Sequence, residues 1–522
     1  MSAPFTRNLS LPLLLTTILG LTSAVAGHAQ SAFWGELRAG RFGVGYRSLY
    51  DDDVARAYDS DYAIPGAAAV KKPRPIFLAL WYPAAPNQES AMVYRDYFRA
   101  PSASSASADS ASTEFAQRLR KFTRDAAAEF TLAKKLDAFT EDDRAAWDGL
   151  LATPIFASLN APPAAGRFPV VLYHPGLAGT FQEDAVACEY LASHGYVVLS
   201  SAFESADSST IKIANDLATS LADLNFLLRY AATLPFAAIG KVAVIGHDFG
   251  AQAALAWRAQ PNSSLDAVVS LDNNAAYLGL EHAPGLQEAL ASAPASTIPV
   301  LLLADAKRHP RFELFRPFLK FAPLYEASLD GLPHNAFVSQ GVLNREDESH
   351  RAFEAACRLT LEFLEAHLRD DAKARQVLEA SREIHYQAPL MAAPTAAQVV
   401  KLYTSESPAA TAALTSLVKT SADSDLLLNA ALQLIEEGRT REAAGLLTWS
   451  ARALPKSARV QCALGQGLVV MGDKVGARTA FEKALQLVSE DPALDASVRV
   501  AVTKAAEAGI EAMHKDALKK ER

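Results

Sequence analysis

The stretch Val242-Ala-Val-Ile-Gly-His-Asp-Phe-Gly250 has the form of a strand, a sharp turn and the start of a helix. The first four residues are apolar and mostly β-branched, and the Ala-rich segment that follows has helical spacing. Two glycines flank the centre of the turn, so the chain can reverse there and push the side chain of Asp248 into a pocket. The pattern predicts that this turn holds the reactive side chain of the protein.

Short apolar strands alternate with helices on both sides of this turn. Such alternation predicts an α/β fold, a mostly parallel sheet with helices on both faces, whose reactive groups lie at the carboxyl ends of the strands. Residues 34–86 read as antiparallel strands that open the same sheet. The expected parallel strands are 170–173, 197–200, 242–245, 267–271 and 300–303, and the expected helices are 182–194, 211–234, 249–259 and 350–368.

The composition excludes several classes of protein. With 522 residues, the chain has room for more than one folding unit. It has 50 basic and 58 acidic residues, a net charge of -8, which argues against non-specific binding to nucleic acid. The three cysteines, Cys188, Cys357 and Cys462, are far apart and have neither the spacing of a disulfide framework nor that of a metal site. We therefore expect neither a disulfide framework nor a structural zinc site.

Residues 1–29 have the order of a secretory signal peptide. Arg7 precedes the apolar run Leu9 to Leu21, and Ala24-Val25-Ala26 resembles a cleavage site. The alternative is an uncleaved anchor, but the run is shorter than the ~20 residues that a spanning helix needs. No later apolar run is long enough to cross a membrane. The sequence predicts an exported protein, periplasmic or secreted, without a stable membrane span.

An aspartate at the centre of the turn limits the chemistry. A carboxylate that attacks an ester carbonyl forms an adduct whose best leaving group is that same carboxylate, so the adduct collapses backwards. A carboxylate can instead displace a leaving group from an sp3 carbon, and water activated by a histidine then cleaves the ester formed on the enzyme. Asp248 therefore favours displacement over direct acyl transfer.

A base and an acid that orients it are expected later in the chain. Asp272 ends the next strand and is the preferred acid, with Asp305 after strand 300–303 as the alternative. His334 follows the last expected strand in the loop 331–337 and is the expected base. The alternative for each of these residues is a structural role, as a loop residue that caps a helix or binds backbone.

Two backbone N–H groups are the expected oxyanion donors. One belongs to Phe249, directly after Asp248, and the other to Leu177, in the Gly-rich loop 174–180. A structural turn is the alternative role of that loop.

Several motifs together resemble the platelet-activating-factor acetylhydrolase group, which is close to the dienelactone-hydrolase-like enzymes of the α/β-hydrolase fold. The resemblance implies residue 248 as nucleophile, Asp272 as acid, His334 as base, and Leu177 and Phe249 as oxyanion donors. Family members hydrolyse short acyl esters with a serine and without a cofactor, so Asp248 departs from the family where the chemistry occurs. The motifs are Trp81-Tyr-Pro83, His174-Pro-Gly-Leu-Ala-Gly179, Leu191-Ala-Ser-His-Gly-Tyr-Val-Val198, Ser270-Leu-Asp272 and Pro333-His-Asn-Ala-Phe337, beside the turn at 246–250.

The Asp-centred turn also resembles that of haloalkane dehalogenases and epoxide hydrolases. Those enzymes commonly have a tryptophan where this chain has Phe249. The resemblance therefore implies alkyl-enzyme chemistry without the indole N–H that holds a halide.

The chain divides into a hydrolase-like domain over 34–370, with a helical insertion at about 93–160, and a helical domain over 396–516. In the helical domain, Gly438 and Gly472 lie 34 residues apart, as do Ala443 and Ala477. This period resembles that of tetratricopeptide repeats, which implies either a protein or peptide partner or packing against the hydrolase-like domain. An unrelated helical bundle is the alternative.

Three functions remain open from the sequence. The first is an exported hydrolase of a small substrate with a displaceable group, such as an alkyl halide or an epoxide, through Asp248. The second is an esterase in which Asp248 activates water. The third is an inactive hydrolase fold that binds a protein partner through its helical repeats.

Overall fold

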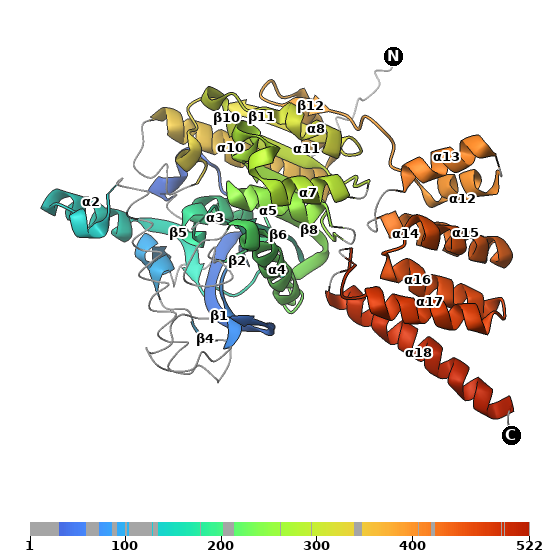
Figure 1. Cartoon of the computed structure of the whole chain (residues 1–522). Helices are drawn as coiled ribbons and strands as arrows, with labels where there is room; N and C mark the ends of the chain where they lie inside the picture. Colours follow the sequence, from blue (N-terminus) through green and yellow to red (C-terminus); the bar gives the residue numbers. More distant parts are fainter. Residues whose placement is uncertain are drawn as a thin grey trace, which may run out of the picture.

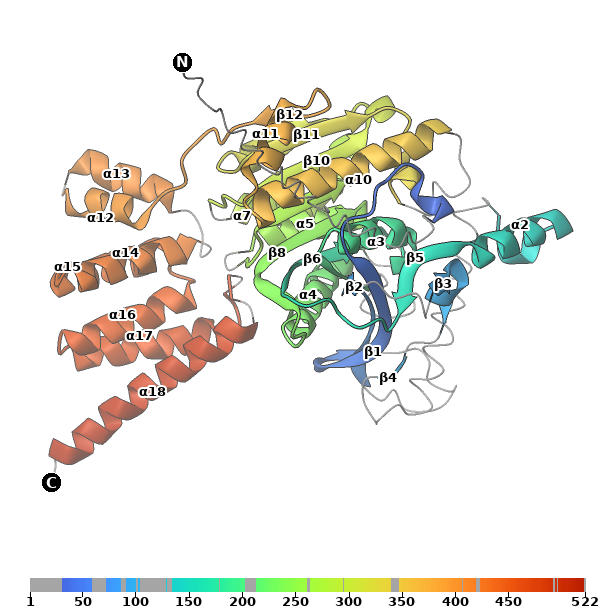
Figure 2. The same ribbon diagram turned by 180° about the vertical axis from the view of Figure 1, so that it is seen from behind.

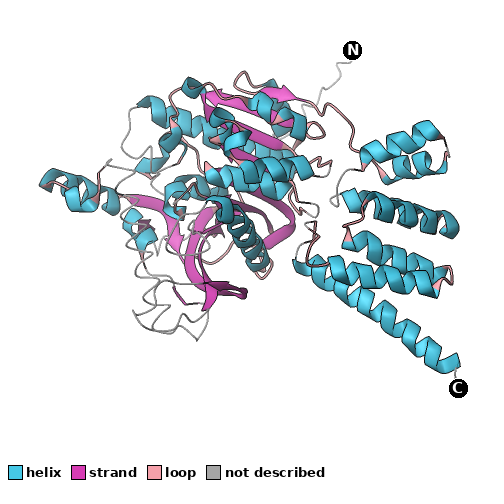
Figure 3. Ribbon diagram, in the orientation of Figure 1, coloured by secondary structure: helices cyan, strands magenta, loops and turns pink. Residues whose placement is uncertain are grey.

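The computed structural model describes most of the chain beyond the predicted signal peptide at 1–29, which lies outside the described residues. Figure 1 shows a part built of a sheet and helices, followed by a stack of helices toward the C-terminus. Figure 3 shows that the strands belong to the first part. The described residues are 31–58, 72–85, 91–99, 102–103, 128, 134–177, 179–201, 213–260, 263–293, 295–338, 347–405, 407–418, 423–491, 493–494 and 496–520.

The described strands form one mixed sheet with the order β12-β11-β10-β9-β8-β6-β7-β2-β1-β5-β3, and β4 pairs with β1. The strands from β7 through β11 run parallel, whereas β1 and β2 are antiparallel, as expected for residues 34–86. The place where β6 and β7 exchange order marks the α/β-hydrolase fold. The strands are β1 (Gly43–Tyr58), β2 (Lys72–Ala84), β3 (Ala91–Val93), β4 (Ser102–Ala103), β5 (Pro154–Leu159), β6 (Phe168–His174), β7 (Val197–Ser201), β8 (Ala237–His247), β9 (Ala267–Leu271), β10 (Val300–Asp305), β11 (Leu324–Leu329) and β12 (His385–Gln387).

The register of the central strands brings their carboxyl ends to one edge of the sheet. His174 of β6 lies beside Gly246 of β8, and His247 of β8 lies beside Leu271 of β9. Leu271 in turn pairs with Leu303 of β10. The turns that follow β6, β8, β9 and β10 therefore meet at one place.

Helices cover both faces of the sheet. Helices α4, α5 and α7 lie on the face seen in Figure 1, and α3 and α10 lie on the face seen in Figure 2. Each face has its own buried apolar cluster, because the central strands are apolar on both sides. The helices are α2 (Glu141–Ala152), α3 (Ala185–Ser193), α4 (Ile213–Ala231), α5 (Phe249–Arg258), α6 (Ala275–Leu278), α7 (Pro284–Ser292), α8 (Arg316–Leu319), α10 (Asp347–Leu368) and α11 (Ala372–Ala380).

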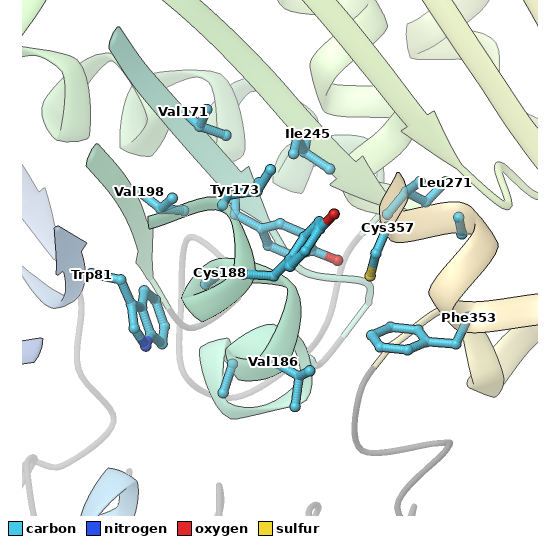
Figure 4. Close-up of a cluster of buried hydrophobic side chains, with 14 of the residues drawn as sticks. Trp81, Val171, Tyr173, Val186, Cys188, Val198, Ile245, Leu271, Phe353 and Cys357 are labelled. Atoms are coloured by element: carbon cyan, nitrogen blue, oxygen red, sulfur yellow. The ribbon is translucent and has the colours of Figure 1, made fainter. Parts of the chain in front are cut away.

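Figure 4 shows the cluster on the α3 and α10 face. Cys188 of α3 and Cys357 of α10 point toward the strands, where Tyr173, Ile245 and Leu271 stand. Both thiols are free and buried, and burial raises the pKa of each above its ordinary value. They act here as small apolar core residues.

The predicted parallel strands and the four helices around them are confirmed, but the parallel strand β11 and the antiparallel strand β12 beside it were missed. His334 follows β11 and not the strand 300–303 that the sequence indicated as the last of the sheet. Strand β11 contains Glu326, which is buried in an ion pair with Arg316 at 2.7 Å. A charged residue in the middle of a buried strand hid its apolar pattern.

The predicted helical insertion at about 93–160 is helical only in part. Its described helix is α2, whereas β5 at its end pairs with β1 in the main sheet, and β3 pairs with β5. The end of the segment expected to be an insertion is therefore part of the sheet.

The region after 395 is helical throughout its described residues. Contacts join α14 to α15 and α16 to α17 as successive helix pairs. None of the described helices is long and apolar enough to cross a membrane. The helices are α12 (Ala396–Thr404), α13 (Pro408–Leu417), α14 (Ser424–Glu436), α15 (Thr440–Ala453), α16 (Ala458–Val470), α17 (Lys474–Leu487) and α18 (Ala496–Lys520).

Candidate active site

The turn between β8 and α5 holds Asp248 in an unusual backbone conformation, with φ 52° and ψ -113°. A non-glycine residue in this region costs about 1–3 kcal/mol. The flanking glycines are required by space, since a Cβ on Gly246 would lie 2.1 Å from the Gly250 carbonyl oxygen. A Cβ on Gly250 would lie 2.2 Å from the carbonyl oxygen of His174. The structure therefore has the sharp, strained turn that the sequence indicates.

The loop after β6 reaches the side chain of Asp248. A Cβ on Gly176 would lie 3.2 Å from the Cβ of Asp248, a tight contact that the glycine avoids. The backbone N–H of Leu177 donates a hydrogen bond to Asp248 Oδ2 at 3.3 Å. Phe249, the other expected oxyanion donor, is the first residue of α5. One of the two expected donors is thus directed at the carboxylate itself.

Asp272 and His334 form a close polar pair in the site. His334 Nδ1 lies 2.5 Å from Asp272 Oδ2, and the Asp272 side chain is fully buried. Because the carboxylate only accepts, the hydrogen of the neutral imidazole is on Nδ1, which leaves the Nε2 lone pair to accept a proton. This is the arrangement of a base and the acid that orients it.

Three further donors bind the Asp272 carboxylate. Arg308 Nη1 donates to Oδ2 at 3.1 Å, while the Asp305 N–H, at 3.1 Å, and the hydroxyl of Tyr277 donate to Oδ1. Burial raises the pKa of Asp272. The hydrogen bonds from His334 and Tyr277 outweigh this effect, so the pKa lies below its ordinary value. Asp272 is therefore an ionised carboxylate inside the protein.

His334 has a pKa above its ordinary value. Its burial lowers the pKa, but the hydrogen bond and charge of Asp272 and the charge of Asp248 outweigh that effect. The histidine is half-buried, as is Asp248, so both side chains reach solvent. The charge of Asp248 thus acts on His334, so the two side chains belong to one site.

Asp305, the alternative acid, has a different position. Its side chain accepts from the Lys307 N–H at 2.9 Å and caps a short 3-10 helix, Ala306–Arg308. Its own N–H donates to Asp272. The structure thus brings His334 to Asp272, and Asp305 supports Asp272 through its backbone.

His247, directly before Asp248, was not expected to take part. Its Nε2 lies 3.2 Å from the carbonyl oxygen of His334, and the two rings have centroids 4.8 Å apart. Burial and the charge of His334 lower the pKa of His247 to about 4, so its ring is neutral at neutral pH. A neutral ring can donate from Nε2 to that carbonyl and hold the His334 loop. Its position between Gly246 and Asp248 was the only signal in the sequence.

A buried glutamate lies behind the loop after β6. Glu183 Oε1 accepts from the Thr180 N–H at 2.8 Å, and the residue is 3% exposed. Burial raises its pKa to about 8, with a further contribution from the charge of Asp248. Glu183 is therefore mostly protonated at neutral pH. Its place three residues after Thr180 is a capping-box pattern that the sequence could have indicated.

A small apolar cavity is lined in part by residues from the central strands and from α10. Tyr173, Ile245 and Leu271 come from the strands and Phe353 and Cys357 from α10, as Figure 4 shows. Among the described residues, no group of three or more His, Cys, Asp or Glu side chains could hold a metal ion.

No protein-family model matches this sequence, and no curated protein matches it. Among solved structures, the chain is similar to a ferulic acid esterase from Streptomyces cinnamoneus, with 17% sequence identity and a TM-score of 0.45. The similarity covers 67% of this chain and 99% of the esterase chain.

Replacing Asp272 with asparagine should lower the pKa of His334, because the hydrogen bond from an ionised partner and its charge are both lost. The loss of one such partner corresponds to about one to three pH units. Histidine ring signals in NMR spectra recorded against pH measure this change, with His334→Gln to assign the signal. Asp305→Asn is the matched control and should leave the pKa of His334 nearly unchanged. The opposite ranking of the two variants would make Asp305 the acid.

Replacing Glu183 with glutamine should stabilise the protein increasingly as pH rises from about 4.5 to 8. In that window the unfolded glutamate is ionised while the folded one keeps its proton, so the wild type loses up to about 1.4 kcal/mol of stability per pH unit. Glutamine avoids this loss and still accepts from Thr180. Urea unfolding at several pH values measures the difference, with the exposed Glu313→Gln as control. A difference that does not change with pH would mean that folded Glu183 is ionised.

Proposed function

We propose that this protein is a hydrolase that attacks an sp3 carbon of a small substrate with Asp248 and then cleaves the resulting ester with water. In this proposal, His334 is the base, Asp272 the acid that orients it, and Leu177 and Phe249 the oxyanion donors. The substrate class is an alkyl halide, an epoxide or another small molecule with a displaceable group.

The hydrogen bond from the Leu177 N–H to Asp248 Oδ2 carries the proposal. In a serine esterase, such a donor serves the oxygen of the substrate carbonyl. Here the donor already serves the carboxylate, so an external ester would have to compete with Asp248 for it. This observation favours an ester formed on Asp248 itself over direct hydrolysis of a bound ester.

The reaction has two steps. First, a carboxylate oxygen of Asp248 forms a bond to the substrate carbon, and the leaving group departs with its electron pair. Second, water attacks the Asp248 carboxyl carbon while His334 Nε2 takes a proton from it. The negative charge then develops on Oδ2, which faces the Leu177 N–H. The alcohol departs with the proton from His334, which leaves Asp248 as a carboxylic acid. This acid releases its remaining proton to solvent and becomes the carboxylate again.

The proposed substrate class includes several kinds of leaving group. Phe249 has no N–H on its ring, so a halide would need other donors. The half-buried Arg308 and Asn274 lie beside Asp248 and Asp272 and have the donors for an anionic leaving group. This supports keeping halides in the substrate class.

We extend the proposal to the rest of the chain. The order of residues in 1–29 supports export, to the periplasm or outside the cell. Gly438 and Gly472 both follow a helix with φ of 76° and 83°, and Ala443 and Ala477 are both buried, which supports tetratricopeptide-like repeats. Exposed apolar side chains, such as Val470 and Val475, support a protein or peptide partner. The motifs of the hydrolase domain support the platelet-activating-factor acetylhydrolase-like group.

A single turnover in heavy-oxygen water should place the label in Asp248, because water attacks the carboxyl carbon and not the substrate. The probes are a haloalkane, an epoxide and a short-chain ester. Peptide mass spectrometry measures the label in the peptide that contains Asp248. In His334→Gln, the alkyl-enzyme should persist as a mass increase equal to the alkyl group. Asp248→Ala is the control without an acceptor.

The alternatives give different results. Label in the product alone would mean direct attack of water on the substrate, with Asp248 as base, and would refute the alkyl-enzyme. No turnover and no adduct with any of the probes would favour an inactive fold that acts through its helical repeats.

A further inference from the structure

Asn274 contacts one carboxylate of the site, that of Asp248, and is joined to the other, that of Asp272, through Arg308. It follows β9 and precedes α6, and it is half-buried. Its Nδ2 donates a hydrogen bond to Asp248 Oδ1, and its Oδ1 accepts from Arg308 Nη2 at 3.0 Å. The amide therefore connects Asp248 to a charged side chain.

The chemistry of its neighbours fixes which way the amide of Asn274 points. A guanidinium only donates, so the atom of Asn274 that faces Arg308 must be the oxygen. An ionised carboxylate only accepts, so the NH₂ group must face Asp248. A reversed amide would lose both hydrogen bonds.

Arg308 is itself held in place. Its Nη1 donates to Asp272 Oδ2 at 3.1 Å, and its guanidinium lies over the ring of Tyr277, 3.7 Å from the centroid. A planar fork can reach Asp272 and Asn274 at once, which the single ammonium of a lysine does less well. Arg308 thus sets the position of the Asn274 amide.

The two oxygens of Asp248 have different surroundings. Oδ2 accepts from Leu177 and lies under the loop after β6, where a Cβ on Gly176 would be 3.5 Å from it. Oδ1 faces Asn274. Since the loop covers Oδ2, Oδ1 is the oxygen that attacks the substrate, and Oδ2 becomes the carbonyl oxygen of the alkyl-enzyme.

We propose that Asn274, positioned by Arg308, donates its hydrogen bond to the departing oxygen when the alkyl-enzyme is cleaved. This inference rests on the proposed function. Water attacks the carboxyl carbon, its proton goes to His334, and the bond between that carbon and Oδ1 then breaks. The electron pair goes to Oδ1, which leaves as the alcohol with the proton from His334. The Asn274 amide keeps its own hydrogens and stabilises the charge that grows on Oδ1.

The same hydrogen bond has opposite effects on the two steps. It stabilises the free carboxylate, so it must weaken as Oδ1 forms a bond to the substrate. It strengthens as Oδ1 gains charge in the second step. Asn274 therefore favours cleavage of the alkyl-enzyme relative to its formation.

Replacing Asn274 with alanine should slow cleavage by about 10²-fold, the effect of removing one donor to a developing oxyanion, while alkylation stays as fast or becomes faster. The substrate is the probe that alkylates His334→Gln. With His334 intact, the variant should then accumulate the alkyl-enzyme in the steady state, and intact-protein mass spectrometry of rapidly quenched samples measures its fraction. Equal slowing of both steps, or no accumulation, would refute the role of Asn274.

Two further variants complete the test. Asn274→Asp can keep the contact with Arg308 and loses the donor, so it should also slow cleavage, and it replaces the alanine variant if that one does not fold. Arg308→Gln should slow cleavage in the wild-type background more than in the Asn274→Ala background, because Arg308 acts partly through Asn274. Equal effects in both backgrounds would refute the positioning role of Arg308.

The result is distinguishable from failure of the proposed function. If His334→Gln forms no adduct with any probe, the alkyl-enzyme itself is refuted. If that adduct forms and the Asn274 variants cleave it at the wild-type rate, only the inference about Asn274 fails.

Discussion

The site depends on one buried negative charge, the carboxylate of Asp272. Removing a carboxylate from water costs several kcal/mol unless hydrogen bonds and opposite charges replace the lost hydration. Four donors do so here, from His334, Arg308, Tyr277 and the backbone of Asp305. The donors come from three segments at the edge of the sheet, at or after the ends of β9, β10 and β11. The charge therefore holds together the segments that carry His334 and the residues beside Asp248.

Much of the hydrolase domain is predictable from its sequence because its central strands are apolar and short. The turn at Asp248 is recognisable for the same reason, since a strand, two glycines and an Ala-rich helix follow each other without interruption. Strand β11 does not show this pattern because it contains Glu326. The charge of Glu326 is balanced by Arg316, a residue ten positions earlier. A sequence pattern cannot indicate that such a pair exists before the fold brings its members together.

The same limit applies to the site. Asp248, Asp272 and His334 are predictable because each lies at or soon after the end of a strand in the order of this fold. The contacts of Asn274 and Arg308 are not, because they arise from turns after two different strands, and their chemistry appears only when the two turns meet. Arg308 on its own reads as a surface charge beside His309. The burial of Glu183 is not predictable either, because nothing in the surrounding sequence indicates that its carboxyl group is buried.

The backbone N–H of Asp248 bonds to the carbonyl of Leu271, and that of Asp272 bonds to the carbonyl of Leu303, so the sheet ladder extends one residue beyond β8 and β9. Both aspartates have a positive φ. Main-chain bonds and the spacing between neighbouring strands, about 4.8 Å, thus set the positions of these two residues before any side chain is considered. In a sheet of this kind, the backbone fixes where a reaction can take place, and the side chains at the strand ends determine its type. Exchange of a single side chain at 248 can change the reaction from acyl transfer to displacement while the backbone that presents it stays the same.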